Sequence, residues 1–194
     1  MKLTLWTVAV ASTLSAAALA QAGRPEPFSR FTIRGGLTDF SVDSRLSRYY
    51  SPETGFIVEA STPFELGELA ITGERATFTS VGAAHPDFHG TLGMLAWRYP
   101  HQLFGPISAA IGGHAGAMQF SFQDSVINAG LRKERELLLG VDGSLEARIV
   151  SALSAFVMVE YSHVRLRVPV HLARVSAGIG YTLPTPLWLR DFLR

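Results

Sequence analysis

The sequence predicts an all-β protein, an eight-stranded antiparallel up-and-down β-barrel whose strands cross a membrane. Hydrophobic residues make up 47% of the 194 residues, yet after the N-terminal segment no uncharged apolar stretch approaches the ~20 residues of a membrane helix. Apolar and polar residues instead alternate with a period of two, which indicates strands. Several alternating segments exceed the ~5–6 residues of ordinary strands and reach the roughly 9–11 residues of membrane strands.

The N-terminal segment has the pattern of a secretory signal peptide. Lys2 precedes an uncharged run of apolar and small residues at positions 3–19, and Ala18, Ala20 and Ala22 supply the small-x-small spacing that signal peptidase needs. We therefore expect residues 1–22 to be removed on export; an N-terminal anchor helix is the alternative. The chain contains no cysteine, which excludes disulfides, lipoprotein acylation and thiolate metal sites.

The clearest strand signal lies at residues 136–149. The odd positions from Leu137 to Ile149 are apolar or small, whereas the even positions include Glu136, Asp142 and Arg148. Residues 154–161 and 171–183 alternate in the same phase. The odd positions of these segments are therefore expected to face lipid, and the even positions to face the barrel interior.

Eight strands are predicted in all, forming one domain at residues 23–183 with a C-terminal periplasmic tail at 184–194. An even strand count places both ends of the barrel domain on the periplasmic side, and the long connections 44–53 and 123–134 are expected to be outer loops. Pro63, Pro100, Pro106 and Pro169 are assigned to connections or strand starts, where a missing N–H is tolerated. The predicted strands are 30–43, 54–62, 68–80, 88–98, 106–122, 135–149, 154–165 and 170–183.

The last predicted strand carries a loose motif. Ser176, Gly178, Tyr181 and Leu183 follow the order polar, x, Gly, x, x, aromatic, x, apolar. This resembles the terminal signal that the assembly machinery of bacterial outer-membrane β-barrels uses, although here residues 184–194 follow it. In its whole strand pattern the chain resembles the small eight-stranded outer-membrane proteins of the OmpA, OmpX and OmpW type. The resemblance implies a porin-like Gram-negative outer-membrane protein, with outer-membrane lipid and the barrel assembly machinery as its partners.

Charged residues of both signs are expected inside the barrel. The interior of an eight-stranded barrel is just wide enough for side chains to fill, and isolated buried charges are costly. A network of ion pairs that closes the lumen is therefore predicted. Its expected members are Arg34, Glu59, Asp142, Glu146, Arg148, Glu160 and Arg174.

The expected function is a structural or adhesive role at the cell surface, and three alternatives stay open. The lumen could form a narrow channel for small or apolar solutes. The chain could be a lipid A-modifying enzyme, because Glu160, Ser162 and His163 lie where lipid A deacylases carry catalytic residues. It could also be a soluble periplasmic barrel that binds an apolar ligand. An enzyme is not expected, since Ser162 and His163 are neighbours on a strand and point to opposite faces.

Further classes of partner and ligand are not expected. The net charge of +1 gives no reason to expect nucleic-acid binding, and the histidine spacing predicts no metal site and no cofactor. A monomer is expected. The tail at 184–194 could lie on the membrane surface as an amphipathic segment or be disordered. Aromatic residues near strand ends are expected to form girdles at the headgroups; these are Phe31, Trp97, Tyr99, Tyr161 and Tyr181.

Overall fold

The computed structural model describes residues 26–43, 46–82, 85–122, 133–165 and 169–193. Eight long strands make up most of these residues. The predicted signal peptide at 1–22 lies outside the described residues, as does most of the predicted loop 123–134. The long strands are β1 (Arg30–Val42), β3 (Gly55–Phe64), β4 (Gly67–Ser80), β5 (Phe88–Phe104), β6 (Ile107–Phe122), β7 (Lys133–Arg148), β8 (Leu153–Val164) and β9 (Val170–Pro184).

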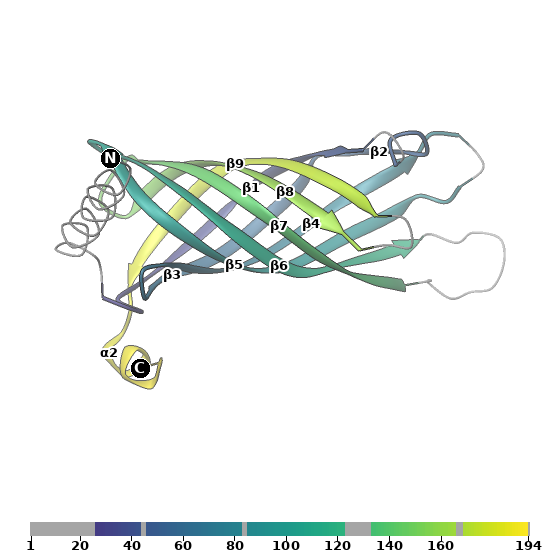
Figure 1. Cartoon of the computed structure of the whole chain (residues 1–194). Coiled ribbons are helices and arrows are strands. Elements are labelled where there is room, and N and C mark those ends of the chain that lie inside the picture. Colours follow the sequence, from purple (N-terminus) through teal and green to yellow (C-terminus); the bar gives the residue numbers. More distant parts are fainter. Residues whose placement is uncertain (1–25, 44–45, 83–84, 123–132, 166–168, 194) are drawn as a thin grey trace, which may run out of the picture.

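The eight strands form a closed ring (Figure 1). Each pairs antiparallel with the next along the chain, and β1 closes the ring by pairing with β9 from Arg30↔Pro184 to Val42↔Leu172. The three-residue strand β2 (Tyr50–Pro52) pairs with β4 outside this ring order. The predicted fold class, an eight-stranded antiparallel up-and-down barrel, is therefore confirmed.

The two ends of the barrel differ in their connections. At the end where β1 begins and β9 finishes, β3 and β4 are joined through Glu65 and Leu66, and β5 and β6 through Gly105 and Pro106. Glu65 and Gly105 have φ of 48° and 49°, the left-handed conformation that tight hairpin turns need. Residues 149–152, between β7 and β8, also lie at this end. The strands β1, β4, β6 and β8 finish at the opposite end, where the described residues 46–54 lie (Figure 1). We call these the terminal end and the loop end.

Along most of each long strand, side chains alternate between the interior and the exterior. Along β8, for example, Phe156, Met158 and Glu160 are buried, whereas Val157 and Val159 are exposed. Every long strand presents large apolar side chains outward, so the exterior is an apolar belt. One example from each strand, all 50–70% exposed, is Ile33, Val58, Ile71, Leu95, Ile111, Leu139, Val159 and Ile179.

Two prolines lie inside strands, contrary to the prediction. Pro63 is in β3, and Pro100 is in β5, which continues to Phe104 instead of ending at residue 98. The physical reason is the same for both. The pairing of β3 with β1 stops at Ser61, and the pairing of β5 with β4 stops at Arg98. Beyond those points each strand has a free edge, where a missing N–H costs no ladder hydrogen bond.

The tail forms a short helix, α2 (Leu187–Leu193), so the alternative of a disordered tail is wrong for these residues. Its apolar side chains Leu187, Trp188 and Phe192 are 68–82% exposed. A bond of 3.1 Å from the Thr185 N–H to the Ser29 carbonyl holds the start of the tail to the barrel. Within the described residues no helix has the length and apolarity to cross a membrane.

Candidate functional site in the barrel lumen

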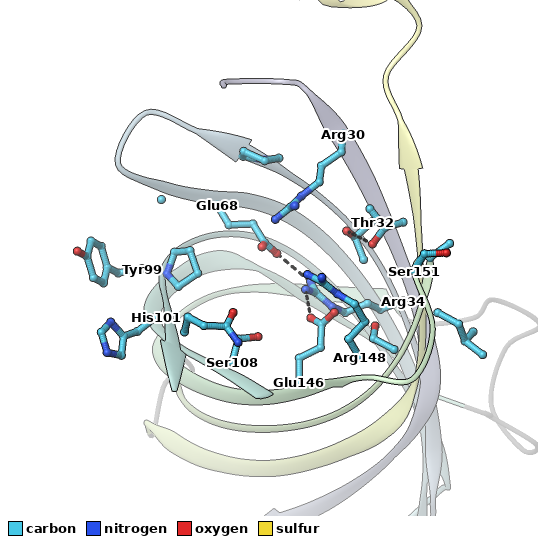
Figure 2. A pocket seen from close by; sticks show the side chains of 18 of the residues that line it. Arg30, Thr32, Arg34, Glu68, Tyr99, His101, Ser108, Glu146, Arg148 and Ser151 are labelled. Atoms are coloured by element: carbon cyan, nitrogen blue, oxygen red, sulfur yellow. Dashed lines mark hydrogen bonds and ion pairs between the residues drawn. The ribbon is translucent and has the colours of Figure 1, made fainter. Parts of the chain in front are cut away.

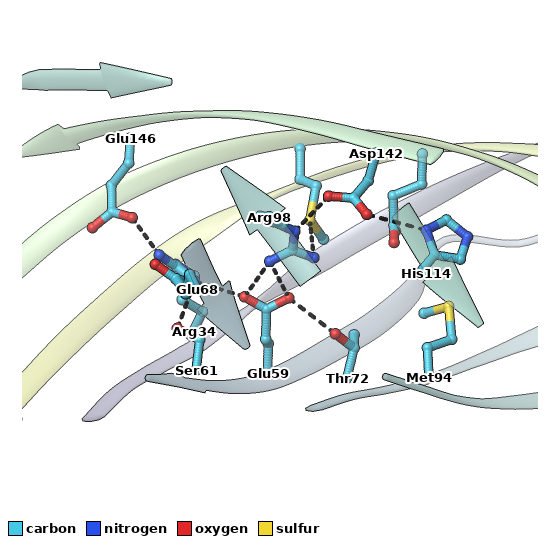
Figure 3. Close-up of polar contacts among 12 residues, drawn as sticks. Arg34, Glu59, Ser61, Glu68, Thr72, Met94, Arg98, His114, Asp142 and Glu146 are labelled. Carbon is cyan, nitrogen blue, oxygen red and sulfur yellow. Dashed lines mark hydrogen bonds and ion pairs between the residues drawn. The ribbon is translucent and has the colours of Figure 1, made fainter. Parts of the chain in front are cut away.

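The charged residues predicted to line the lumen come from different strands and meet because they share the inward phase. Arg34 of β1 contacts three carboxylates from three other strands. Its Nη1 lies 2.7 Å from Glu59 Oε1 and 2.9 Å from Glu68 Oε1, and its Nη2 lies 2.6 Å from Glu146 Oε2. Figure 3 shows this cluster beside Ser61, whose hydroxyl accepts a further bond from Nη1 at 3.0 Å. Arg34 thus ties β1 to β3, β4 and β7.

Arg98 of β5 continues the network. Its Nη1 lies 2.8 Å from Glu59 Oε2, and its Nε donates to Asp142 Oδ1. Thr72 donates to Glu59 Oε2 at 2.9 Å (Figure 3). The side chains of Glu59, Arg98 and Asp142 are at most 2% exposed, so each charge has lost its water and is stabilised by its partners.

Asp142 also joins the network to His114 of β6 and Ser162 of β8. His114 Nδ1 lies 3.2 Å from Asp142 Oδ2, and its Nε2 lies 2.7 Å from Ser162 Oγ. Ser162 Oγ also accepts a bond from Arg174 Nη2 at 3.0 Å, so this hydroxyl links His114 to Arg174.

This chain of contacts has the connectivity of a hydrolytic triad, but its three side chains are sealed inside the wall. Ser162 is 0% exposed, Asp142 4% and His114 5%. The serine–histidine pair that the sequence suggested is different, and the structure does not bring it together: Ser162 points inward and His163 outward. His163 instead lies against His171, with ring centroids 5.0 Å apart.

Arg174 of β9 is a fully buried cation of the lumen. Its Nη1 donates to Glu74 Oε2 at 2.8 Å, and its Nη2 lies 3.3 Å from Glu160 Oε1. Glu74 Oε1 and Glu160 Oε2 are buried and accept no hydrogen bond from the described residues. Two carboxylates therefore share one guanidinium at this level of the lumen.

An apolar cluster fills the lumen between Arg174 and the loop end. Its centre is aromatic: Phe78 and Phe88 stack with ring centroids 4.6 Å apart, and Phe40 and Phe120 pack against them. Phe78, Phe88, Leu138 and Leu172 are at most 1% exposed. The cluster closes the loop end of the barrel among the described residues. Its buried members are Phe40, Ala76, Phe78, Phe88, Leu92, Met94, Met118, Phe120, Leu138, Val164, Val170 and Leu172.

The terminal end is hollowed instead. A cavity of about 660 Å³ lies between the ion pairs of Arg34 and the mouth of the barrel (Figure 2). Its lining is polar and includes Arg30, Glu68, Glu146 and Arg148. From the terminal end the lumen therefore passes from a polar cavity, through two levels of ion pairs, to an apolar cluster.

Six of the seven predicted luminal residues form ion pairs with one another or with further residues, and one does not. Arg148 lines the cavity, is exposed, and makes no ion pair within the described part of the chain. The six that pair are Arg34, Glu59, Asp142, Glu146, Glu160 and Arg174.

The residues of the predicted assembly signal lie along the seam between β1 and β9. Ser176 points inward and donates to Thr38 Oγ1 at 2.9 Å. Gly178 faces Gly36 in the register. Tyr181 and Leu183 point outward and are 51% and 42% exposed.

Sequence reasoning missed several members of the network, namely Glu68, Glu74, Arg98, His114 and Ser162 as a partner of His114. Polar and apolar residues alternate irregularly in segments 68–80 and 88–98, so the sequence does not show which residues there point into the barrel. Yet Glu68, Thr72 and Glu74 share the even phase, and Arg98 shares it with Leu92 and Met94. Even phase combined with charge is the signal that would have found them.

Comparison with known proteins identifies the fold. No protein-family model and no curated protein matches the chain. Among solved structures, Neisserial surface protein A is 14% identical and superimposes with a TM-score of 0.62, covering 78% of this chain and 96% of that one. OprG from Pseudomonas aeruginosa is 13% identical, with a TM-score of 0.56 over 84% of this chain and 98% of that one.

A third structure is Ail, the attachment invasion locus protein of Yersinia pestis, in complex with the heparin analogue sucrose octasulfate. It is 15% identical and has a TM-score of 0.54, over 82% of this chain and 100% of that one. The closed ring, the apolar belt and these similarities agree. The chain therefore has the fold of the small eight-stranded outer-membrane β-barrels of Gram-negative bacteria, as its strand pattern and last-strand motif indicated.

Proposed function

We propose that this chain is an outer-membrane β-barrel with a structural or adhesive role at the cell surface, and that its lumen is closed to solutes. One observation carries the proposal: apolar side chains cover the outside of all eight strands, whereas ion pairs and an aromatic cluster fill the inside. An apolar belt of this kind is stable in lipid and not in water. A barrel filled in this way has no open path between its ends.

A soluble barrel that binds an apolar ligand fits the structure less well. Such a protein places its apolar face inside the barrel, whereas here Glu59, Arg98 and Arg174 are buried inside and Ile71 and Ile111 are exposed outside. The apolar residues that do lie inside, such as Phe78 and Phe88, pack against one another.

In a surface role, the loop end of the barrel would contact the environment. Residues 46–54 of the connection between β1 and β3, including β2, lie there (Figure 1). The similar structure of Ail holds a sulfated heparin analogue, so sulfated glycans are the first class of ligand to test. The proposal includes no enzymatic activity, because His163 and Ser162 lie on opposite faces and Ser162 is sealed from solvent.

A narrow channel is the second candidate, and the polar cavity at the terminal end favours it. Conduction would require the Arg34–Glu146 pair and the stack of Phe78 on Phe88 to separate. Single-channel recording of the barrel in planar bilayers distinguishes the two roles. The proposal expects no unitary conductance from the wild type, and a steady conductance would favour the channel.

The partners we propose are outer-membrane lipid and the barrel assembly machinery, with the barrel as a monomer. Tyr181 and Leu183 present the predicted assembly signal on the outer face of β9. Tyr181→Asp should reduce the amount of protein in the outer membrane, whereas Tyr49→Asp, an exposed tyrosine outside the long strands, should not. Equal loss for both variants would contradict recognition of this segment.

Membrane fractionation and adhesion assays test the main proposal. The wild type should sediment with the outer membrane and migrate faster on gels when unheated. Cells that display it should bind immobilised sulfated glycan, and replacing residues 44–53 and 123–132 with short Gly-Ser linkers should abolish the binding without changing fractionation. A soluble periplasmic protein would refute the membrane role, and unchanged binding by the loop variant would refute the adhesive role.

A further inference from the structure

The outward face of β7, β8 and β9 changes from apolar to basic toward the loop end. On β7 the outward residues run from Val141 and Leu139 to Arg135 and Lys133, all of them exposed. Because the strands alternate, the glutamates at 134 and 136 belong to the other phase. The basic side chains thus begin where the apolar belt ends.

The neighbouring strands repeat this change at the same height. On β8, Val159 and Tyr161 are followed outward by His163, and Arg165 continues the exposed phase just past the strand. The Arg165 N–H donates to the Leu137 carbonyl at 2.9 Å, which sets Arg165 beside β7 at the edge of the belt. Arg165 therefore lies beside β7 at the height where the apolar belt gives way to basic side chains.

Two histidines and a tyrosine complete this region. His163 pairs with His171 in the β8–β9 register, and the ring of His171 stacks on Tyr161 at 5.5 Å and 12°. A tyrosine at the edge of an apolar belt is typical of the headgroup region of a membrane. We name the group of outward residues Lys133, Arg135, His163, Arg165 and His171 the rim patch.

The rim patch concentrates cations on three adjacent strands. Elsewhere toward the loop end the exposed residues are mixed in charge: Arg48 and Arg75 are basic, whereas Asp39 of β1 accepts a bond from Thr54 at 2.7 Å and Glu53 accepts one from Thr79 at 2.7 Å. Within the described chain Lys133 and Arg165 form no ion pair, and Arg135 gives only its Nε, to Gln119 at 3.0 Å. The patch therefore keeps unpaired donors directed outward.

We propose that the rim patch binds the phosphate groups of an outer-leaflet lipid, of the bisphosphorylated lipid A class. This inference rests on the proposed membrane role and names the lipid chemistry for one side of the barrel. Arginine and lysine bind phosphate strongly, the patch has the complementary charge, and it stands at the depth where phosphates meet acyl chains. Acyl chains would lie along Val141, Val159 and Tyr161 below it.

The test is a titration of the detergent-solubilised, folded mature barrel with fluorescent bisphosphorylated lipid A. The patch variant is Lys133→Gln/Arg135→Gln/Arg165→Gln. The matched control is Arg30→Gln/Arg75→Gln/Arg148→Gln, which removes the same charge from the terminal end and from β4. Because basic side chains attract anionic lipid headgroups, the patch variant should bind at least about tenfold more weakly, whereas the control should bind as the wild type does.

Two further arms separate the causes. Binding should fall when dephosphorylated lipid A replaces the bisphosphorylated form, and it should weaken with added salt. Equal binding of both lipids by the wild type, or equal loss for the patch and control variants, would overturn the inference. Heat-modifiable migration of every variant shows that it is folded. Failure of the wild type to fractionate with the outer membrane refutes the proposed function by itself, and the titration does not depend on that result.

Discussion

Gly140 lies opposite His114 in the β6–β7 register, and it makes room for the imidazole that joins Asp142 to Ser162. A Cβ atom at position 140 would lie 2.4 Å from His114 Nε2 and 2.2 Å from the Tyr161 carbonyl oxygen. Neither the backbone of Tyr161 nor the enclosed ring can retreat far. The glycine is thus part of the luminal network although it carries no side chain.

The first prediction concerns this contact. Gly140→Ala should displace His114 and lower the free energy of unfolding by about 1–3 kcal/mol, the usual cost of overpacking. Urea unfolding in lipid vesicles, followed by gel migration, measures the change. Gly73→Ala is the control, because a Cβ there meets nothing within 4 Å. Equal stability of the two variants would show that the ring adjusts freely.

The second prediction concerns Arg98, which holds Glu59 and Asp142 together. Arg98→Met keeps an unbranched side chain but removes the guanidinium, which leaves these two buried carboxylates without their shared partner. The free energy of unfolding should fall by about 3–5 kcal/mol. Arg75→Met is the control, since Arg75 is exposed on the outer face of β4. A loss below about 1 kcal/mol would mean that the network is not stabilised by this cation.

The third prediction concerns the shared guanidinium of Arg174. Because Glu74 and Glu160 both face it, Glu160→Gln removes a repulsive charge and should change the free energy of unfolding by less than about 1 kcal/mol. Arg174→Leu leaves both carboxylates unpaired and should cost about 3–5 kcal/mol. Urea unfolding of both variants in lipid vesicles measures the two changes in the free energy of unfolding. A larger loss for Glu160→Gln than for Arg174→Leu would reverse the argument.

The fourth prediction concerns the apolar belt. Ile111→Arg and Leu145→Arg place a cation in the middle of the apolar belt on β6 and β7, and each should cost roughly 2–4 kcal/mol, as expected near the bilayer midplane. Val150→Arg, in the exposed connection between β7 and β8, should cost at most about 1 kcal/mol. Refolding yield into vesicles measures both. An unchanged refolding yield for Ile111→Arg would refute the contact of this residue with lipid.

The strand positions could be predicted from the sequence because one physical rule governs each strand. A barrel in lipid has an apolar outside and a filled inside, so alternation survives wherever both faces are constrained, as in β7 and β9. Alternation weakens in β4 and β5, where small residues such as Ala70 and Ala96 occupy inward positions. The inward positions of Glu74 and Arg98 lie in these two strands.

The partners within the lumen could not be predicted in the same way. Arg34 and Glu146 are 112 positions apart in the chain and meet only because strand tilt and register bring them to one height. The spacing of His114 to other histidines predicts whether they could share a metal ion, but it does not reveal the luminal partners of an inward residue on β6. The alternation along a strand assigns a residue to the lumen. The stagger of the strands around the closed barrel decides which luminal residues come into contact.

The pairing of β1 with β9 sets an order of events in folding. Arg30↔Pro184 is the first contact of the seam, so the residue that completes the barrel is made more than 150 residues after the one it pairs with. Until β9 exists, β1 and β8 are open edges that could pair with other chains. Closure must therefore follow synthesis of the whole domain, and a product truncated before β9 would leave an aggregation-prone sheet instead of a smaller barrel.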